Sequence, residues 1–205
     1  MINKQLKAIF IHIPKNAGTS IEKALGANLK NLHKGPNRSK HGTPKDKIYK
    51  NLWNNDEFFK FCFVRNTFDR FVSAYEYDYM MSFSKGYAMR PKGPDTARRK
   101  KVRRLGKEGF NTFVEDFFSK KRQQIPVWYR RQTYWTHAAE YDFIGRFENI
   151  EDDFKKVTEK LGIQAKLPKV NSSKRSNYKE YYNDKSIEII SNFYKKEIEE
   201  YNYSF

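Results

Sequence analysis

The chain has 205 residues, in which 41 lysines and arginines outnumber 24 aspartates and glutamates and give a formal net charge of +17. Hydrophobic residues make up 38% of the sequence and aromatic residues 17%, which suffices for a core and excludes disorder throughout. The length favours a single domain over residues 1–205. The one cysteine, Cys62, excludes an internal disulfide framework and a zinc site built from several thiolates.

Charge and hydropathy limit the location and the partners of the chain. No apolar run approaches the roughly 18–20 residues that span a bilayer, and the first residues lack the apolar stretch of a secretory signal. We therefore expect no transmembrane segment and a cytoplasmic location. The positive charge suits nucleic acids, acidic membrane surfaces, anionic polysaccharides and phosphorylated cofactors.

Strands and helices alternate three times along the chain. Apolar runs predict strands over residues 8–13, 59–64 and 141–147, and apolar residues at helical spacing follow each of them. A last helix follows, with Asp184 as its expected N-cap. This order predicts an α/β class, a P-loop-like three-layer fold in which helices flank a mostly parallel central sheet.

Two long segments interrupt this alternation. Residues 28–50 and 84–107 contain glycine, proline and many polar residues, which predicts loops. The second segment is a basic insertion with six lysines and arginines between positions 98 and 104. Such a run is most often solvated surface, and it could steer an acidic partner by long-range attraction.

The turn after the first predicted strand has the composition of an anion-binding loop. Its residues are, in order, Pro14, Lys15, Asn16, Ala17, Gly18, Thr19 and Ser20. The N–H groups at the start of the following helix attract an anion, Gly18 lets it approach the backbone, and Lys15 adds positive charge. The alternative is an ordinary turn in which Thr19 or Ser20 caps the helix.

The second strand ends in another cationic residue. Arg65 stands at its carboxyl end, where open α/β sheets bind ligands, and its planar fork suits a phosphate monoester. Ser73, about two turns into the next helix, could supply a second donor. A structural ion pair between Arg65 and Asp69 is the alternative. The first turn is not an ATP loop, because such loops carry lysine directly after their second glycine whereas Lys15 precedes Gly18.

The two turns together resemble the cofactor motifs of sulfotransferases. The resemblance lies in residues 15–20 and in residues 63–75, and it extends to residues 144–150 and 171–182. The most similar group is the family-2 carbohydrate sulfotransferases, which include heparan 2-O- and chondroitin-type Golgi enzymes and small bacterial relatives. Thr67 stands where that family often has proline.

The resemblance implies a donor, 3′-phosphoadenosine 5′-phosphosulfate (PAPS), a product nucleotide (PAP), no metal, and transfer of a sulfuryl group to a hydroxyl. By this analogy residues 15–20 cradle the 5′-phosphosulfate, while Arg65 and Ser73 hold the 3′-phosphate. Lys174 and Arg175 match a late loop of the family that could close over the donor. Lys15 would also act in catalysis, by neutralising charge on the leaving oxygen.

A base is needed to take the proton from the acceptor hydroxyl, and histidine suits this role. His12 belongs to the first strand and is interpreted as packed core, and His137 has no supporting context. His41 lies in a stretch that resembles the family segment bearing the catalytic base, so it receives that role, with His33 as the fallback.

The acceptor is less defined by the sequence. The segment of Arg130, Arg131 and Gln132, with Tyr134 and Trp135, combines charged forks with an amide and flat rings, and it suits a sugar that carries anionic groups. We therefore expect an anionic glycan as the hydroxyl-bearing acceptor and no nucleic-acid partner.

Two other classes of function remain open from the residues. A non-catalytic nucleic-acid-binding protein would account for the charge, but it leaves the two anion-binding turns unexplained. A kinase with a degenerate phosphate loop would need ATP and magnesium.

Overall fold

The computed structural model describes residues 1–26, 41–83, 94–119, 125–168 and 176–205, which form two compact units. The first unit comprises Met1–Arg65 and Arg131–Ser172, and the second comprises Asn66–Arg130 and Ser173–Phe205. The four strands found in these ranges lie in the first unit, and the described elements of the second are helical. The single-domain organisation predicted for residues 1–205 stays a prediction.

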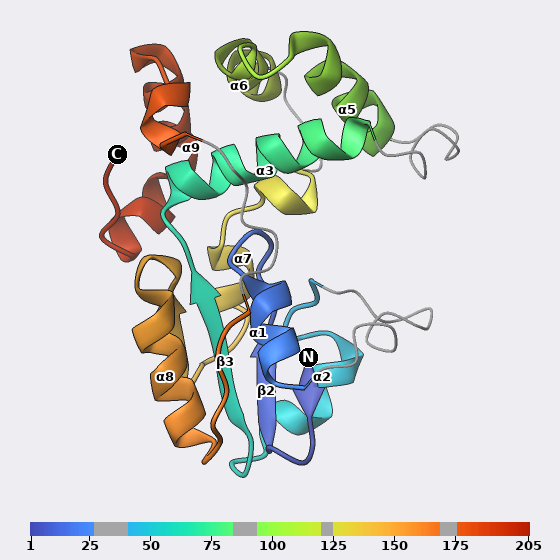
Figure 1. Cartoon of the computed structure of the whole chain (residues 1–205), viewed down its shortest axis with the longest axis vertical. Helices are drawn as coiled ribbons and strands as arrows, with labels where there is room; N and C mark the ends of the chain where they lie inside the picture. Colours follow the sequence, from blue (N-terminus) through green and yellow to red (C-terminus); the bar gives the residue numbers. More distant parts are fainter. Residues whose placement is uncertain (27–40, 84–93, 120–124, 169–175) are drawn as a thin grey trace. The chain divides into compact units, whose positions relative to one another are not determined.

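The first unit is built on one sheet, shown in Figure 1. Its strands are β1 (Ile2–Asn3), β2 (Ala8–Ile11), β3 (Phe59–Val64) and β4 (Phe143–Arg146), and they lie side by side in that order. The pairs β2–β3 and β3–β4 are parallel, while β1 is antiparallel to β2. The α/β class is thus confirmed, with one correction: the sheet is partly antiparallel, because the short β1, which the sequence did not indicate, pairs with β2.

Side chains of alternating strand residues form the core of the first unit. Ala8 and Phe10 of β2 and Phe61 and Phe63 of β3 belong to one buried cluster, since parallel partners in register point to the same face. The helices α1 (Gly18–Ala24) and α8 (Ile150–Lys160) pack their apolar faces into the same cluster. α8 ends before Gly162, whose φ of 65° is typical of a residue that stops a helix.

Three short elements complete the first unit: α2 (Lys47–Trp53), α7 (Thr133–Thr136) and the 3₁₀ helix η2 (Phe147–Asn149). α2 corrects the prediction of a loop up to residue 50, since the apolar residues Tyr49 and Trp53 are buried one turn apart. The earlier part of that predicted loop, residues 28–40, lies outside the described residues.

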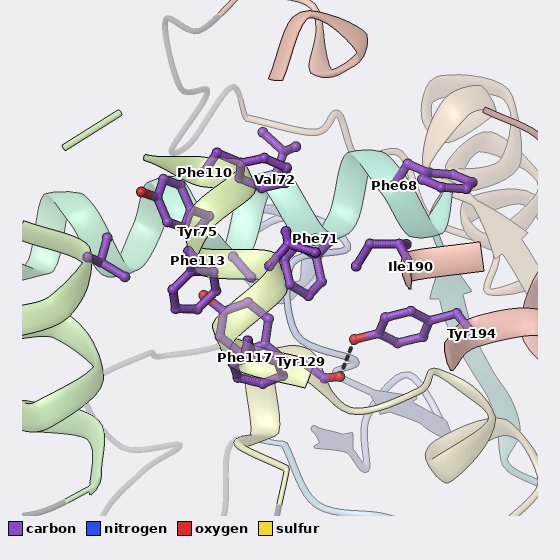
Figure 2. Close-up of a cluster of buried hydrophobic side chains, with 13 residues drawn as sticks. Phe68, Phe71, Val72, Tyr75, Phe110, Phe113, Phe117, Tyr129, Ile190 and Tyr194 are labelled. Atoms are coloured by element: carbon purple, nitrogen blue, oxygen red, sulfur yellow. Dashed lines mark hydrogen bonds between the residues drawn. The ribbon is translucent and has the colours of Figure 1, made fainter. Parts of the chain in front are cut away.

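The second unit packs helices around an aromatic core. Its elements are α3 (Thr67–Ser82), α5 (Pro94–Leu105), α6 (Phe110–Ser119) and α9 (Asp184–Glu200), with 3₁₀ helices η1 (Val127–Tyr129) and η3 (Tyr178–Tyr181). Figure 2 shows Phe71 of α3 among the rings of Phe113, Phe117 and Tyr129. The hydroxyl of Tyr194 on α9 donates a hydrogen bond to the carbonyl of Tyr129, which ties η1 to this core.

Asparagine side chains cap the two longest helices of the second unit. The side chain of Asn66 accepts from the N–H of Phe68 at 3.0 Å and begins α3. Asn183 forms a capping box with Ser186 at the start of α9. The predicted cap, Asp184, is instead the first helical residue, where its negative charge still favours the helix N-terminus.

The basic segment departs from its prediction as a loop. Residues 94–105 form α5, and two of its arginines, Arg98 and Arg99, are only 6% and 3% exposed. Both guanidinium groups bond to the fully buried carboxylate of Asp78 on α3, with Arg98 Nε at 2.5 Å and Arg99 Nε at 3.1 Å. The hydroxyl of Tyr129 donates to the same carboxylate at 2.9 Å. Lys100, Arg103 and Arg104 of the same run are exposed, while Lys101 is half-buried.

The buried carboxylate of Asp78 provides a first test of the fold. We expect Asp78→Ala to lower the free energy of unfolding by about 3–5 kcal/mol, because it leaves two buried guanidinium groups without their counter-charge. Denaturant unfolding followed by circular dichroism measures this change. The control Glu115→Ala removes an exposed ion pair with Lys185 and should cost less than about 1 kcal/mol.

The thiol of Cys62 reports whether the first unit is still folded in the same variants. Burial raises the pKa of the Cys62 thiol in β3, so this thiol should resist alkylation while the first unit is folded. Rapid alkylation of native Asp78→Ala would mean that the damage extends to the first unit. Equal stability of the Asp78 and Glu115 variants would contradict the structural role of the buried cluster.

Candidate functional site

The candidate site lies in the first unit at the edge where the three parallel strands end. β2, β3 and β4 run in the same direction, so the segments that follow Ile11, Val64 and Arg146 leave the sheet at one edge. These segments carry Lys15, Arg65 and Phe147. Ligands of open α/β sheets bind at such an edge.

The backbone of the predicted anion loop has an unusual conformation. Lys15 has a φ of 71° and Ala17 a φ of 58°, while Asn16 between them and Gly18 after them have no positive φ. Alternating signs of φ turn successive backbone N–H groups toward a common concave side, the arrangement called a nest, which binds anions. Residues with side chains rarely adopt positive φ. Holding two of them in one turn therefore supports the anion-binding interpretation of residues 15–18.

The side chain of Arg65 contacts this loop directly. Its Nη1 donates a hydrogen bond to the carbonyl oxygen of Lys15 at 2.9 Å, and its guanidinium carbon lies 3.8 Å from the centre of the Phe147 ring. Arg65 is only 7% exposed. A flat contact between guanidinium and ring fixes the plane of the fork. The two cationic residues that the sequence places on separate turns thus lie side by side.

The amide side chain of Gln132 joins the anion loop to the end of β3. Its Oε1 accepts from Asn16 Nδ2 at 2.8 Å and from the Arg65 N–H at 2.9 Å, and its Nε2 donates to the Arg65 carbonyl at 2.8 Å. Asn16 Nδ2 also donates to the carbonyl of Phe63 at 2.6 Å. Gln132 is fully buried and Asn16 is 1% exposed. These bonds explain how the loop is held against the neighbouring strand.

His41 lies beside the strand that leads to the anion loop. Its Nδ1 is 3.0 Å from the carbonyl oxygen of His12, and the two imidazole rings meet edge to face with centres 4.6 Å apart. The indole Nε1 of Trp135 donates to the carbonyl of His41 at 2.9 Å. Thr43 follows and is held by two bonds from its N–H and hydroxyl to the carboxylate of Asp46.

His12 is buried beneath the anion loop. It is 4% exposed, which agrees with its interpretation as core, and its Nδ1 lies 3.0 Å from the carboxylate of Glu22 on α1. A Cβ atom at Gly18 would stand 2.2 Å from His12 Cδ2. The glycine of the loop is therefore required by the imidazole packed against it, a constraint that no pattern in the sequence indicates.

The other predicted site residues have different surroundings. Thr19 is half-buried and Ser20 is 7% exposed on α1, whose N-cap is Ala17 without a side-chain bond. Ser73 is half-buried on α3 in the second unit, as is Arg130 at the end of that unit's η1 segment. Arg131 is exposed in the first unit. His33, Lys174 and Arg175 lie outside the described residues.

Three features of the site were missed by the sequence interpretation. Gln132 was assigned to the acceptor, whereas its buried amide bonds to Asn16 and Arg65. Trp135 was grouped with the acceptor rather than with His41, and Phe147 was given no role in the site. Gln132 follows two arginines in the sequence, a pattern that does not indicate burial. Its contacts with Asn16 and Arg65 arise only in the folded chain.

Among the residues that the structure describes, no three histidine, cysteine, aspartate or glutamate side chains gather as metal ligands would. In the same part of the chain, no helix has both the length and the apolar character needed to cross a bilayer.

The chain matches one known protein family. The sequence model of the sulfotransferase family matches residues 1–204, a range that includes both predicted anion-binding turns and His41. No curated protein and no solved structure matches the chain at a significant level.

The contact between Gly18 and His12 gives a second test. We expect Gly18→Ala to destabilise the protein by about 1–3 kcal/mol, because the added methyl group must displace the buried imidazole. Thermal unfolding measures the loss. Ala17→Gly is the matched control in the same loop, and it should be tolerated because glycine accepts the φ of 58° without strain. Equal tolerance of both changes would show that the packing under the loop is loose.

Proposed function

The chain belongs to the sulfotransferase family, and we propose that it transfers the sulfuryl group of PAPS to a hydroxyl group, on an anionic glycan, in the cytoplasm. The observation that carries the proposal is the hydrogen bond between the Arg65 guanidinium and the Lys15 carbonyl. It brings two cationic groups to one edge of the sheet, as a ligand with several anionic groups requires.

The chemistry of the donor fits the residues at this edge. PAPS carries a phosphosulfate on one side of its nucleoside and a phosphate monoester on the other. The nest of residues 15–18 and the Lys15 ammonium suit the phosphosulfate, and Asn16, Thr19 and Ser20 complete the same turn. The Arg65 fork suits the monoester, with Ser73 as a second donor.

The contacts of His41 suit a general base. A carbonyl oxygen only accepts hydrogen bonds, so the contact with the His12 carbonyl favours the tautomer that carries its proton on Nδ1. The lone pair then lies on Nε2, which can accept the proton of a hydroxyl. The T-shaped contact with the His12 ring and the bond from Trp135 restrict the orientation of this imidazole.

The proposed reaction is a direct in-line displacement at sulfur. His41 Nε2 takes the proton of the acceptor hydroxyl as the new bond between its oxygen and sulfur forms. Lys15 and the loop N–H groups stabilise the negative charge on the phosphate oxygen as its bond to sulfur breaks. The products are a sulfate ester, PAP and a proton on His41. The donor supplies the activated sulfur, and no metal takes part in the proposed steps.

Charge supports an anionic glycan as the acceptor. The chain carries a net charge of +17, and Arg131 is exposed in the unit that holds the site. Arg130 and Gln132 belong to the same segment in the sequence, although the amide of Gln132 is occupied by Asn16 and Arg65. We propose that Lys174 and Arg175 add positive charge at the donor.

Calorimetric titration with PAP tests the donor assignment. We expect PAP to bind and ATP to bind poorly, because the loop lacks the lysine position of ATP loops. Arg65→Ala should weaken PAP binding by about 10- to 100-fold, the effect of losing a charge-assisted hydrogen bond. Arg104→Ala, an exposed arginine in the other unit, is the control and should change little. Equal affinity for ATP and PAP would contradict the proposal.

Substitution of His41 tests the base. His41→Gln should retain PAP affinity and lose about 10²- to 10⁴-fold in turnover with sulfated-glycan precursors, since glutamine cannot take up the proton. Wild-type activity should fall as the pH is lowered and the imidazole becomes protonated. His137→Gln, which changes an exposed histidine of the same unit, should leave turnover unchanged. An active His41→Gln enzyme would exclude His41 as the base.

A further inference from the structure

We propose that α7 acts as a brace, by which we mean that Gln132 at its start and Trp135 within it are positioning residues. Together they fix the place of the donor loop (residues 15–20) relative to His41. This inference rests on the proposed function, because it concerns how the same site is assembled. It gives Gln132 a role other than contact with the acceptor, and it adds Trp135, which the family motifs in the sequence do not include.

Gln132 uses its whole amide group to join two turns. Its Oε1 accepts from Asn16 and from the Arg65 N–H, and its Nε2 donates to the Arg65 carbonyl. The bonds lie between 2.8 and 2.9 Å, and the side chain is fully buried. A buried polar group whose partner is removed loses far more than the net value of one hydrogen bond. This amide therefore helps to hold the loop around Asn16 against the end of β3, together with the bond from Asn16 to the Phe63 carbonyl.

Trp135 acts on the segment that carries the base. Its indole ring is fully buried, and Nε1 donates to the His41 carbonyl at 2.9 Å. This bond fixes the backbone at residue 41, while the His12 carbonyl fixes the ring through Nδ1. The carbonyl of Trp135 is itself held by the hydroxyl of Tyr141 at 3.0 Å.

The two side chains are linked through one helical turn. The N–H groups of Trp135 and Thr136 donate to the carbonyl of Gln132 at 2.9 and 3.2 Å. A shift of this turn would move the partner of Asn16 and Arg65 together with the partner of His41. α7 thus couples the placement of the donor loop to the placement of the base, although we expect neither of its two side chains to touch a reactant.

The two contacts can be removed separately. Gln132→Leu keeps the approximate volume and leaves Asn16 and Arg65 without the amide, and Gln164→Leu changes an exposed glutamine of the same unit as its control. Trp135→Phe removes the indole N–H. Its control is Trp53→Phe, which removes a similar bond, from Trp53 Nε1 to the Glu140 carbonyl at 3.2 Å, elsewhere in that unit.

Three readouts apply to each variant: PAP affinity by calorimetry, exchange of the Arg65 amide proton, and the His41 tautomer from long-range ¹H–¹⁵N spectra. Gln132→Leu should weaken PAP binding by about 10-fold or more and speed exchange at Arg65 by a similar factor, because the acceptor of that N–H is gone. Trp135→Phe should leave PAP affinity within about 2-fold, while the Nδ1–H form of His41 gives way to a mixture of tautomers. Both controls should match the wild type.

A conservative variant guards against general damage to the fold. Gln132→Glu keeps the shape and one acceptor, but its ionised carboxylate cannot donate to the Arg65 carbonyl. Its PAP affinity relative to the wild type at the same pH should improve as the pH falls, since the protonated acid regains a donor. No such recovery would mean that the amide only fills space, which would contradict the positioning role.

The outcomes separate this inference from the proposed function. A wild-type protein that does not bind PAP would contradict the donor assignment. The exchange rate of the Arg65 amide and the tautomer of His41 would still test the positioning roles of Gln132 and Trp135. An unchanged tautomer in Trp135→Phe, or an Arg65 amide that exchanges in Gln132→Leu as in Gln164→Leu, would overturn the brace even if PAP binds.

Discussion

The hydrogen bond from the Arg65 guanidinium to the Lys15 carbonyl is the contact on which the candidate site depends. It is possible because β2 and β3 are adjacent and parallel, so that their following turns leave the sheet at one edge. An antiparallel arrangement would place the two turns at opposite ends of the strands. The bond joins the Arg65 cation to a backbone carbonyl dipole of the loop.

The conformation of residues 15–18, which we propose binds an anion, costs free energy of folding. Lys15 and Ala17 have positive φ angles, each of which costs about 1–2 kcal/mol for a residue with a side chain. The amide groups of Asn16 and Gln132 and the imidazole of His12 hold the loop in this conformation from below. Such preorganisation is expected of a site that stabilises charge, because the N–H groups need not reorient during the reaction.

Much of the first unit could be predicted from the sequence, for a physical reason. Strands buried on both faces read as continuous apolar runs, and small residues between a strand and a helix indicate close approach to the backbone. The loop, Arg65 and the presence of three parallel strands follow from these local patterns and from the alternation of strands with helices. The antiparallel β1 could not be found in this way, since two residues are too few to show alternation.

The remaining features depend on contacts between distant residues. Gln132 bonds to Asn16, which is 116 positions away in the sequence, and to Arg65, which is 67 positions away. No local pattern can therefore predict the hydrogen-bond partners of its amide. The sequence pattern predicts solvated surface for the arginines of α5. Two of them are buried because they donate hydrogen bonds to the carboxylate of Asp78, which lies on α3 and is not indicated by the local sequence. Local composition indicates charge, but whether a charge is buried is decided by its partner.

We propose that two cationic turns at one edge of the sheet hold a single donor nucleotide, and a crystal structure of the protein with PAP would test this. We expect the 5′-phosphate within hydrogen-bond distance of the backbone N–H groups of residues 15–20 and the 3′-phosphate against the Arg65 guanidinium. A nucleotide bound elsewhere, or one that contacts the loop with its 3′-phosphate far from Arg65, would contradict the claim.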